Sequence, residues 1–347
     1  MNKKITITSL PLELRKKIKK VTQPSFIPPM LATLTNDYFS DKEWLYEHKF
    51  DGERCIAFKK KGVVTLMSRN KKKMNEMYPE LVTALTKQTA DNFIIDGEIV
   101  SRGKNGVSDF ELLQGRMNLR AGSPEEAKQK KIAIIYCIFD LIYVDGSDVR
   151  ALPLYARKEL LKNLLSYNKI LSYTTHIIGD GITFFKKACN LHWEGLIAKQ
   201  VDSEYVGKRS RNWLKFKCIM KQELVIAGYT APQGSRSYFG ALLVGYYKEG
   251  KLMYAGKVGT GYSEDTLALL GKKLQKLKVT KCPFADYEQS LKGVTWVKPT
   301  LVAEFQFAQW TNAGRLRVGR YKGLRDDKSA KDVVRETAKP IGPTKNR

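Results

Sequence analysis

Lys49 is the residue of this sequence best placed for nucleophilic chemistry. It lies in an apolar stretch over residues 44–50, which predicts a strand, and Asp51-Gly52 directly after it favours a turn that would let the amine project from the strand end. A lysine attacks an electrophile only when its amine is neutral, and neighbouring cations lower its pKa toward that state. The candidate cations are Arg54, Lys199, Lys215 and Lys217. Taken alone, Lys-x-Asp-Gly is most often a surface turn, so the assignment depends on companions elsewhere in the chain.

Two carboxylates further along the chain are candidate ligands for a divalent cation. Asp96-Gly97-Glu98 places two acids two residues apart in a predicted strand, and such residues share one face of the strand. Glu194 stands beside Gly195, five residues before the basic Lys199. Because Mg²⁺ prefers oxygen ligands and bridges phosphates, Glu98 and Glu194 are the predicted metal-binding acids.

Basic and aromatic side chains could bind the nucleotide and phosphate groups. Lys215 and Lys217 alternate with apolar residues, so both amines share one strand face and could neutralise a phosphate. The alternative for this segment is a half-buried strand with a solvated face. Phe139 lies in the most apolar predicted strand and could stack on a base. Arg69 adds a cation at the end of another predicted strand.

These residue types together suit nucleotidyl transfer to a lysine. A lysine nucleophile, a divalent metal, phosphate clamps and a base-stacking ring are the parts that reaction needs. The sequence contains no G-x-x-x-x-G-K-[ST] phosphate loop, and its three scattered histidines indicate no Ser–His–Asp system.

The elements that must position these residues change in character along the chain. Residues 11–20 predict a short basic helix, and the prolines of 22–34 predict extended backbone. Five strands are then predicted, and they cover residues 44–50, 55–58, 63–67, 93–100 and 132–144. Helices are predicted from Ser123 onward, over 154–165 and over 264–277. Short strands with glycine turns after about residue 220 indicate a small barrel of the OB type.

Composition favours a polyanionic partner. The 347 residues include 61 Lys and Arg against 35 Asp and Glu, a net charge of +26. Nucleic acid is the leading partner, an anionic membrane surface is second, and plain solubility is the alternative. Five cysteines without a C-x-x-C pair disfavour a disulfide scaffold and a zinc site. The absence of a signal-like apolar stretch and of a long apolar run predicts a cytoplasmic protein without a membrane span.

The ordered set of motifs resembles the covalent nucleotidyltransferase superfamily, and specifically ATP-dependent DNA ligases, over residues from about 25 to about 335. The second half is the more specific part. Residues 234–243, 255–262, 304–311 and 316–328 are similar to the ligase domain of bacterial non-homologous end-joining ligases. We expect no polymerase or phosphoesterase module of the kind often fused to such ligase domains.

The resemblance implies roles around the nucleotide base and sugar. Lys49 matches the lysine that takes AMP, and Glu47 matches the residue that reads the adenine amino group. Arg54 and Arg69 match arginines near the ribose and the 5′-phosphate of a nick. Phe139 matches the ring stacked on adenine.

The resemblance also implies phosphate and metal ligands. Glu98 matches the acid near the ribose and metal, and Glu194 the second metal-associated acid. Three lysines match phosphate ligands: Lys199, Lys215 and Lys217. Arg211 matches an arginine beside the nucleotide. The last motif of the family, which closes over ATP, is matched by Arg325, Asp327 and Lys328.

We therefore expect an α+β protein with a nucleotidyltransferase (ATP-grasp-like adenylation) domain followed by an OB-fold β-barrel. The expected bounds are 1–21 for a basic N-terminal segment, 22–220, 221–335, and 336–347 for a basic tail. The expected activity is that of an ATP-dependent DNA ligase that seals 5′-phosphate/3′-hydroxyl nicks through a lysyl-AMP intermediate, in DNA repair or end joining.

The expected cofactors are ATP and Mg²⁺, with Mn²⁺ as the alternative ion. The expected partners are nicked or broken duplex DNA and a Ku-like end-joining protein, for a monomer in the cytoplasm, associated with the nucleoid. An RNA ligase or a capping-type nucleotidyltransferase is the first alternative. A non-catalytic nucleic-acid-binding protein is the second.

Overall fold

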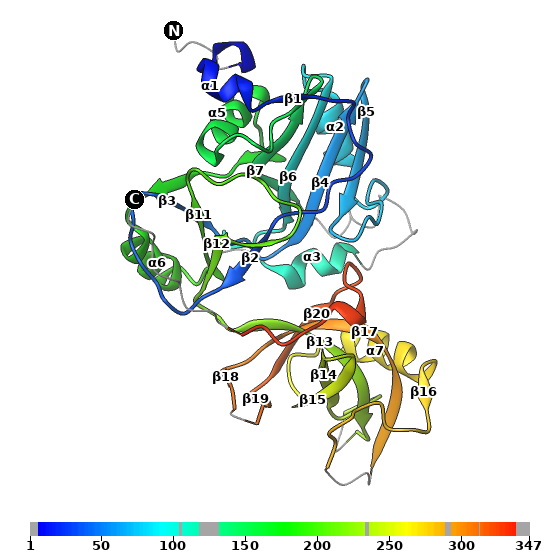
Figure 1. Ribbon diagram of the computed structural model, residues 1–347. Helices are drawn as coiled ribbons and strands as arrows, with labels where there is room; N and C mark the ends of the chain where they lie inside the picture. The colour runs from blue at the N-terminus through cyan, green and yellow to red at the C-terminus, as the bar shows by residue number, and fades with distance from the viewer. Residues whose placement is uncertain are drawn as a thin grey trace. The chain divides into compact units, whose positions relative to one another are not determined.

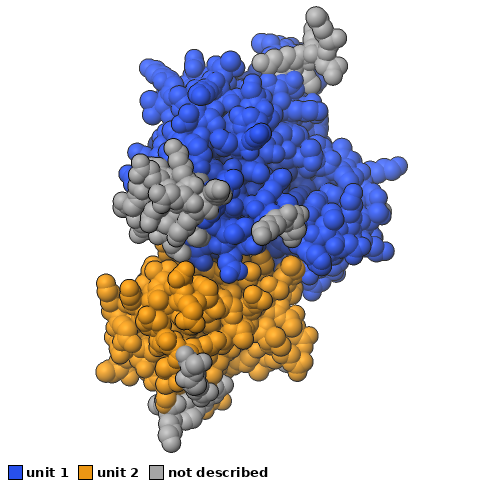
Figure 2. Space-filling view, turned by 180° about the vertical axis from the view of Figure 1, so that it is seen from behind, with its two compact units in different colours: residues 1–218, 338–347 blue, residues 219–337 orange. Residues whose placement is uncertain are grey.

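The computed structural model describes residues 6–103, 106–117, 132–232, 236–288, 293–311 and 313–337 (Figure 1). They belong to two units, of which the first runs to Cys218 and the second covers Ile219–Thr337 (Figure 2). Within the described ranges, no helix is long and apolar enough to cross a membrane.

The first sheet of unit 1 follows the order β1-β8-β7-β6-β4-β5, with β9 added beside β7. Its strands are β1 (Lys19–Lys20), β4 (Glu53–Lys60), β5 (Val63–Ser68), β6 (Asn92–Val100), β7 (Ile135–Val144), β8 (Ser147–Asp148) and β9 (Leu171–Tyr173). Lys61-Gly62 and Asp145-Gly146 join consecutive strands, and all four residues have positive φ. Such two-residue turns match the twist of the strands they connect, which explains the tight hairpins.

Both faces of this sheet are buried. Ala57 of β4 joins a core with helices α2 (Pro79–Thr86), α3 (Phe110–Met117) and α5 (Leu154–Leu164). The next residue, Phe58, points to the opposite face and packs with Phe139 and Trp213 in a separate cluster. Burial on both sides explains why these strands read as nearly continuous apolar runs.

The second sheet of unit 1 carries the predicted adenine reader and several of the predicted phosphate-binding residues. Its order is β10-β3-β11-β12-β2, from β10 (His176–Ile178), β3 (Trp44–His48), β11 (Gly195–Gln200), β12 (Arg209–Lys217) and β2 (Leu31–Leu34). One face packs against helix α6 (Gly181–Asn190) through Tyr46, Leu196 and Phe216. The other face meets the first sheet through Trp213.

In its described residues, unit 2 contains a six-stranded sheet, a two-stranded sheet, one helix and a short turn η2 (Ala330–Asp332). The order is β15-β14-β13-β17-β16, with β20 beside β17. The strands are β13 (Lys221–Thr230), β14 (Leu242–Lys248), β15 (Lys251–Val258), β16 (Lys278–Val279), β17 (Val294–Gln306) and β20 (Arg320–Leu324), and β18 (Gln309–Trp310) pairs with β19 (Leu316–Arg317). Helix α7 (Glu264–Gln275) begins after the Ser263 cap. Its leucines at 267, 270 and 274 are buried in the core, as the helical spacing predicts.

Three expectations from the sequence need correction or qualification. The basic helix predicted over 11–20 is only α1 (Leu12–Lys16), after a short turn η1 (Ile7–Ser9), because the chain from Lys19 joins the first sheet as β1. The helix predicted from Ser123 lies outside the described residues. Cys189 and Cys218 form a disulfide that the sequence reasoning did not foresee, since 29 residues separate them in the chain.

Candidate active site

Lys49 follows β3 and forms an ion pair with Glu194. Lys49 Nζ lies 2.5 Å from Glu194 Oε1, and the two side chains are 17% and 6% exposed. Burial alone would lower the pKa of Lys49, but Glu194 outweighs it, and with Asp51 and Glu98 it holds that pKa above the usual value. The prediction that cations lower the pKa of this amine is therefore wrong, because its strongest charged neighbours are acids.

Strand register explains why Glu194 reaches Lys49. Strands β3 and β11 are antiparallel with Leu196 opposite His48, and Lys49 N donates a hydrogen bond of 3.0 Å to Gly195 O. Gly195 has φ of 148°, and a Cβ there would lie 1.9 Å from Phe216 O. Only glycine allows the chain to pass this close to β12, so the Glu194-Gly195 pair places the carboxylate where the two strands meet.

Strand pairing brings the predicted lysines to one face of the second sheet. Ile197 of β11 lies opposite Glu47 of β3 on one side and opposite Lys215 of β12 on the other. Gly195 of β11 lies opposite Lys217 of β12. Residues in register, and those two apart along a strand, share a face. Lys49, Glu47, Lys199, Lys215 and Lys217 therefore lie on one face. The intervening Leu214 and Phe216 pack toward α6 on the other, as the alternation predicts.

Glu47 is buried between two lysines. Its side chain is 2% exposed, and Lys199 Nζ lies 2.6 Å from Oε2. Lys158 Nζ donates a hydrogen bond to Oε1 and another of 3.1 Å to Thr174 O. Burial would raise the pKa of Glu47, but Lys158 and then Lys199 outweigh it and hold the pKa below the usual value. The predicted adenine reader is therefore an ionised carboxylate with fixed partners.

Lys199, a predicted phosphate ligand, lies beside aromatic rings in this structure. Its Nζ is 4.0 Å from the ring centroid of Trp213 and 4.3 Å from that of Phe139. Burial lowers the pKa of Lys199 to about 8, although Glu47 acts in the opposite direction. The Phe139 ring is thus in contact with the Lys199 ammonium. It lies on the face of the first sheet that packs against Trp213 of β12.

Arg54, which is predicted to lie near the ribose, forms an ion pair with the buried Asp96. Its Nε and one terminal nitrogen each donate to Asp96 at 2.6 Å, and the guanidinium carbon lies 4.6 Å from the Phe139 centroid. Tyr205 donates a further hydrogen bond of 2.6 Å to Asp96. Burial would lower the pKa of Arg54, but Asp96 outweighs it and raises that pKa. Asp96 is fully buried whereas Glu98 is partly exposed, so of these two acids Glu98 is the one that a ligand can reach.

The predicted basic residues outside this cluster are more exposed. Arg211 is exposed on β12, and Arg69 is partly exposed directly after β5. Both lie in unit 1, and each has interactions with neighbouring groups.

In unit 2 the predicted last motif forms its own ionic cluster. Arg325 donates two hydrogen bonds to the Asp327 carboxylate, at 2.9 and 3.0 Å, and both side chains are buried. Lys328 Nζ lies 3.0 Å from Glu223 Oε1 on β13. Burial would raise the pKa of Asp327, but Arg325 outweighs it and lowers that pKa. The three motif residues are therefore brought together, with their charges paired within unit 2.

The predicted metal ligands are two acids, too few to hold a metal ion without other donors. Across the residues the structure describes, no group of three or more His, Cys, Asp and Glu side chains could hold a metal by itself. Mg²⁺ is commonly bound by one or two carboxylates together with substrate phosphates and water. Glu98 and Glu194 both influence the Lys49 amine through their charge, so the two predicted metal ligands lie near that amine.

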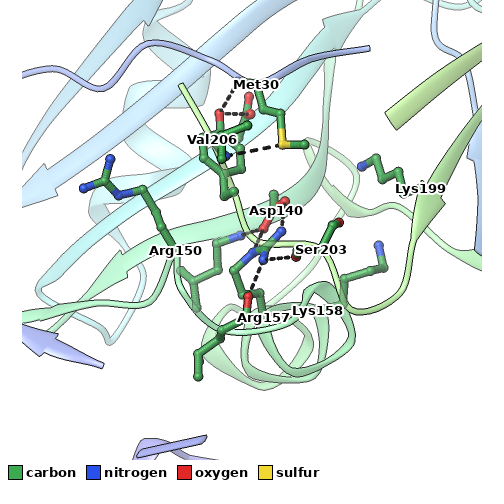
Figure 3. Close-up of polar contacts among 12 residues, drawn as sticks. Met30, Asp140, Arg150, Arg157, Lys158, Lys199, Ser203 and Val206 are labelled. Atoms are coloured by element: carbon green, nitrogen blue, oxygen red, sulfur yellow. Dashed lines mark hydrogen bonds and ion pairs between the residues drawn. The ribbon is translucent and has the colours of Figure 1, made fainter. Parts of the chain in front are cut away.

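Sequence reasoning missed two residues that organise this site. Arg157 of α5 donates hydrogen bonds of 2.7 and 3.0 Å to Asp140 of β7, and both side chains are fully buried (Figure 3). Lys158 is the next residue. The signal was available, because residues 157 and 158 fall at helical spacing between the buried Leu154 and Leu161.

Comparison with known proteins identifies the two halves separately. Residues 29–217 match the family model for the ATP dependent DNA ligase domain, and residues 235–328 match that for the ATP dependent DNA ligase C terminal region. The multifunctional non-homologous end joining protein LigD of Pseudomonas aeruginosa is 36% identical over 331 residues, which cover 93% of this chain and 38% of the relative. The LigD of Mycobacterium tuberculosis H37Rv is 37% identical over 327 residues, with 92% and 41% covered. The chain thus spans about two fifths of the length of these relatives.

A solved structure confirms the predicted fold class. The mycobacterial DNA ligase D complexed with ATP and MES is 34% identical, with a TM-score of 0.63, and the match covers 89% of this chain and 98% of that one. A nucleotidyltransferase domain followed by an OB-fold domain is therefore the architecture of this chain.

Proposed function

The chain belongs to the ATP-dependent DNA ligase family, and on that premise we propose that it seals 5′-phosphate/3′-hydroxyl nicks in duplex DNA through an adenylate carried on Lys49. The observation that carries the proposal is the row of charged groups on one sheet face. Glu47 lies in β3 and Lys49 follows that strand directly, whereas Lys215 and Lys217 lie in β12. Glu194 forms an ion pair with the Lys49 amine at the end of this row.

The proposed reaction has three transfers. Lys49 Nζ attacks the α-phosphorus of ATP, a P–N bond forms, and the bond to the bridging oxygen breaks to release pyrophosphate. A 5′-phosphate oxygen then takes the AMP from the lysine. Finally the 3′-hydroxyl attacks that phosphate, a phosphodiester forms and AMP leaves.

The first transfer requires that Lys49 lose a proton. The amine is held as an ammonium by Glu194, and its proton must leave before the nitrogen lone pair can attack. Glu194 Oε1, which lies 2.5 Å from Lys49 Nζ, is positioned to take that proton before the attack.

We assign the other predicted residues by the chemistry of their side chains. Glu47 and Phe139 would bind the adenine, and Arg54 and Arg69 would lie toward the ribose and the nick phosphate. The phosphates would be bound by the lysines and arginines already predicted: Lys199, Lys215, Lys217, Arg211, Arg325 and Lys328, with Asp327 orienting Arg325. Mg²⁺, or Mn²⁺ in its place, would be held by Glu98 and Glu194 and would neutralise charge on the phosphates.

We propose duplex DNA as the substrate, bound mainly through its phosphates. The net charge of +26 favours such a polyanion without sequence preference. The relatives named as end-joining proteins support a role in rejoining breaks beside a Ku-like partner. We further propose a monomer that acts in the cytoplasm at the nucleoid.

Incubation with ATP labelled at the α-phosphate and Mg²⁺ tests the proposal. The wild-type chain should become labelled, a Lys49→Ala variant should not, and Lys42→Ala, which changes an exposed lysine of the same unit, should label normally. Labelled enzyme should then seal nicked DNA in preference to nicked RNA. An unlabelled wild-type chain, or a labelled Lys49→Ala chain, would falsify the proposal, and labelling by GTP instead would favour the capping-type alternative.

A further inference from the structure

The Glu47 carboxylate has a lysine on each oxygen, and the two lysines come from different elements. Lys158 of α5 donates to Oε1, and Lys199 of β11 lies 2.6 Å from Oε2. A carboxylate offers about four acceptor positions. The group can therefore keep both lysines and still accept a hydrogen bond from a third donor.

Lys158 is the more rigidly held of the two lysines. Its side chain is 1% exposed, it donates a second hydrogen bond to Thr174 O at 3.1 Å, and its Nζ lies 4.8 Å from the Tyr173 ring centroid. Helix α5 is also fixed to its surroundings by the neighbouring Arg157, which donates hydrogen bonds to Asp140, Leu152 O and Ser203 O (Figure 3).

Lys199 has a different environment. Apart from Glu47, its ammonium lies against the rings of Trp213 and Phe139. Phe139 is the residue proposed to stack on adenine, so Lys199 borders the space the base would enter. Lys158, in contrast, comes from helix α5, and its second hydrogen bond goes to Thr174 O. Oε1 of Glu47 is therefore bound to the more rigidly held lysine, Lys158. Oε2 is bound to Lys199, the lysine near the proposed position of the base.

An ionised carboxylate can only accept hydrogen bonds. The 6-amino group of adenine donates, whereas the 6-oxygen of guanine accepts and would be repelled. A protonated or rotated Glu47 would lose this distinction. Whatever fixes the charge and direction of Glu47 therefore sets the choice of base.

We propose that Lys158 is a positioning residue that holds Glu47 as an oriented acceptor for the adenine 6-amino group, and so determines nucleotide specificity. The proposal rests on the proposed function, because it concerns the nucleotide that reacts with Lys49. Lys158 itself does not touch the reacting atoms.

The test compares lysyl-adenylate formation with ATP and with purine riboside triphosphate, which lacks only the 6-amino group. A hydrogen bond to a charged group corresponds to roughly a ten- to hundredfold preference for ATP in the wild-type chain. In Lys158→Met this preference should fall to within about threefold, mainly because ATP reacts more slowly, and GTP should be excluded less well. Lys162→Met, at an exposed lysine one turn further along α5, should retain the wild-type ratio.

Three further outcomes separate the alternatives. If Lys158→Met slows both nucleotides by the same factor, Lys158 only supports the fold and the proposal is overturned. If the wild-type chain forms the adenylate but does not distinguish the two nucleotides, base reading by Glu47 is overturned while lysyl-AMP formation stands. If the wild-type chain forms no adenylate with ATP, the proposed function itself fails.

A double variant covers the case in which Lys158→Met does not fold. Glu47→Gln with Lys158→Met removes both charges of that pair, and the glutamine oxygen can still accept a hydrogen bond from the buried Lys199. Its preference for ATP should equal that of Glu47→Gln alone, because both residues act through one hydrogen bond. A double variant that discriminates less than Glu47→Gln would show that Lys158 acts independently of Glu47, against the proposal.

Discussion

Replacing Arg157 with methionine should destabilise unit 1 strongly, because it leaves Asp140 as a buried charge without its partner. The two side chains are fully buried and share hydrogen bonds of 2.7 and 3.0 Å. Arg157 also satisfies Leu152 O at 2.5 Å and Ser203 O at 2.8 Å. Removing one partner of a buried ion pair costs about 3–5 kcal/mol. For a unit of this size each kcal/mol lowers the melting temperature by about 2–4 °C, so the expected drop is about 6–20 °C.

The adjacent Arg150–Asp148 pair supplies a matched control. Arg150 makes a similar two-bonded contact with Asp148, at 3.0 and 2.6 Å, but its side chain is 38% exposed. Water screens an exposed pair, so Arg150→Met should lower the free energy of unfolding by no more than about 1 kcal/mol.

Differential scanning calorimetry of the full chain provides the measurement. Asp140→Leu combined with Arg157→Met should recover part of the lost stability, because both charges are then absent. Equal losses for Arg150→Met and Arg157→Met, or no recovery in the double variant, would refute the reasoning that buried charge dominates the effect.

Three other predictions follow from the same structure. Gly195→Ala should lower the free energy of unfolding by about 2–5 kcal/mol and slow lysyl-AMP formation, since its Cβ would meet Phe216 O at 1.9 Å; normal melting and labelling would contradict this. Because the pKa of Glu47 is lowered in the folded protein, Glu47 stabilises the fold at pH values above its unfolded pKa of about 4.3. This stabilisation is lost as the pH falls through the lower pKa of the folded state. Between about pH 6 and pH 3, the urea midpoint of unfolding should therefore fall more for the wild-type chain than for Glu47→Gln. Binding to nicked duplex should weaken steeply with added salt, and a flat dependence in a titration would argue against phosphate contacts.

The sequence predicted the elements with strong local signals and missed the others. Residues 44–48 and 93–100 form strands as their apolar runs predict, and the leucine stripe over 264–277 marks a buried helix face. Helices α2 and α6 were missed, although Pro79 is the first residue of α2 and the Asp180 side chain caps α6 by accepting from Thr183 N. Both helices are shorter, at 8 and 10 residues, than the predicted α5 and α7, at 11 and 12, so fewer apolar positions were available to reveal their spacing.

The candidate site could be predicted as a set of residues but not as a set of contacts. Motif order identified Lys49, Glu194 and Lys217, yet the neighbour of the amine depends on which residue of β11 lies opposite β3. Register therefore determined that an acid, and not a lysine, sets the charge of Lys49. The role of Lys158 depends on the packing of α5 near β3, which no local pattern contains.

The disulfide between Cys189 and Cys218 has a mechanical consequence for the chain. Cys189 lies in the last turn of α6, and Cys218 directly follows β12 at the final residue of the first unit. A force applied to the chain after Cys218 is transmitted through the disulfide to helix α6, so it does not act directly on the pairing of β12 with β11. Lys217, one residue before the disulfide, therefore keeps its place opposite Gly195.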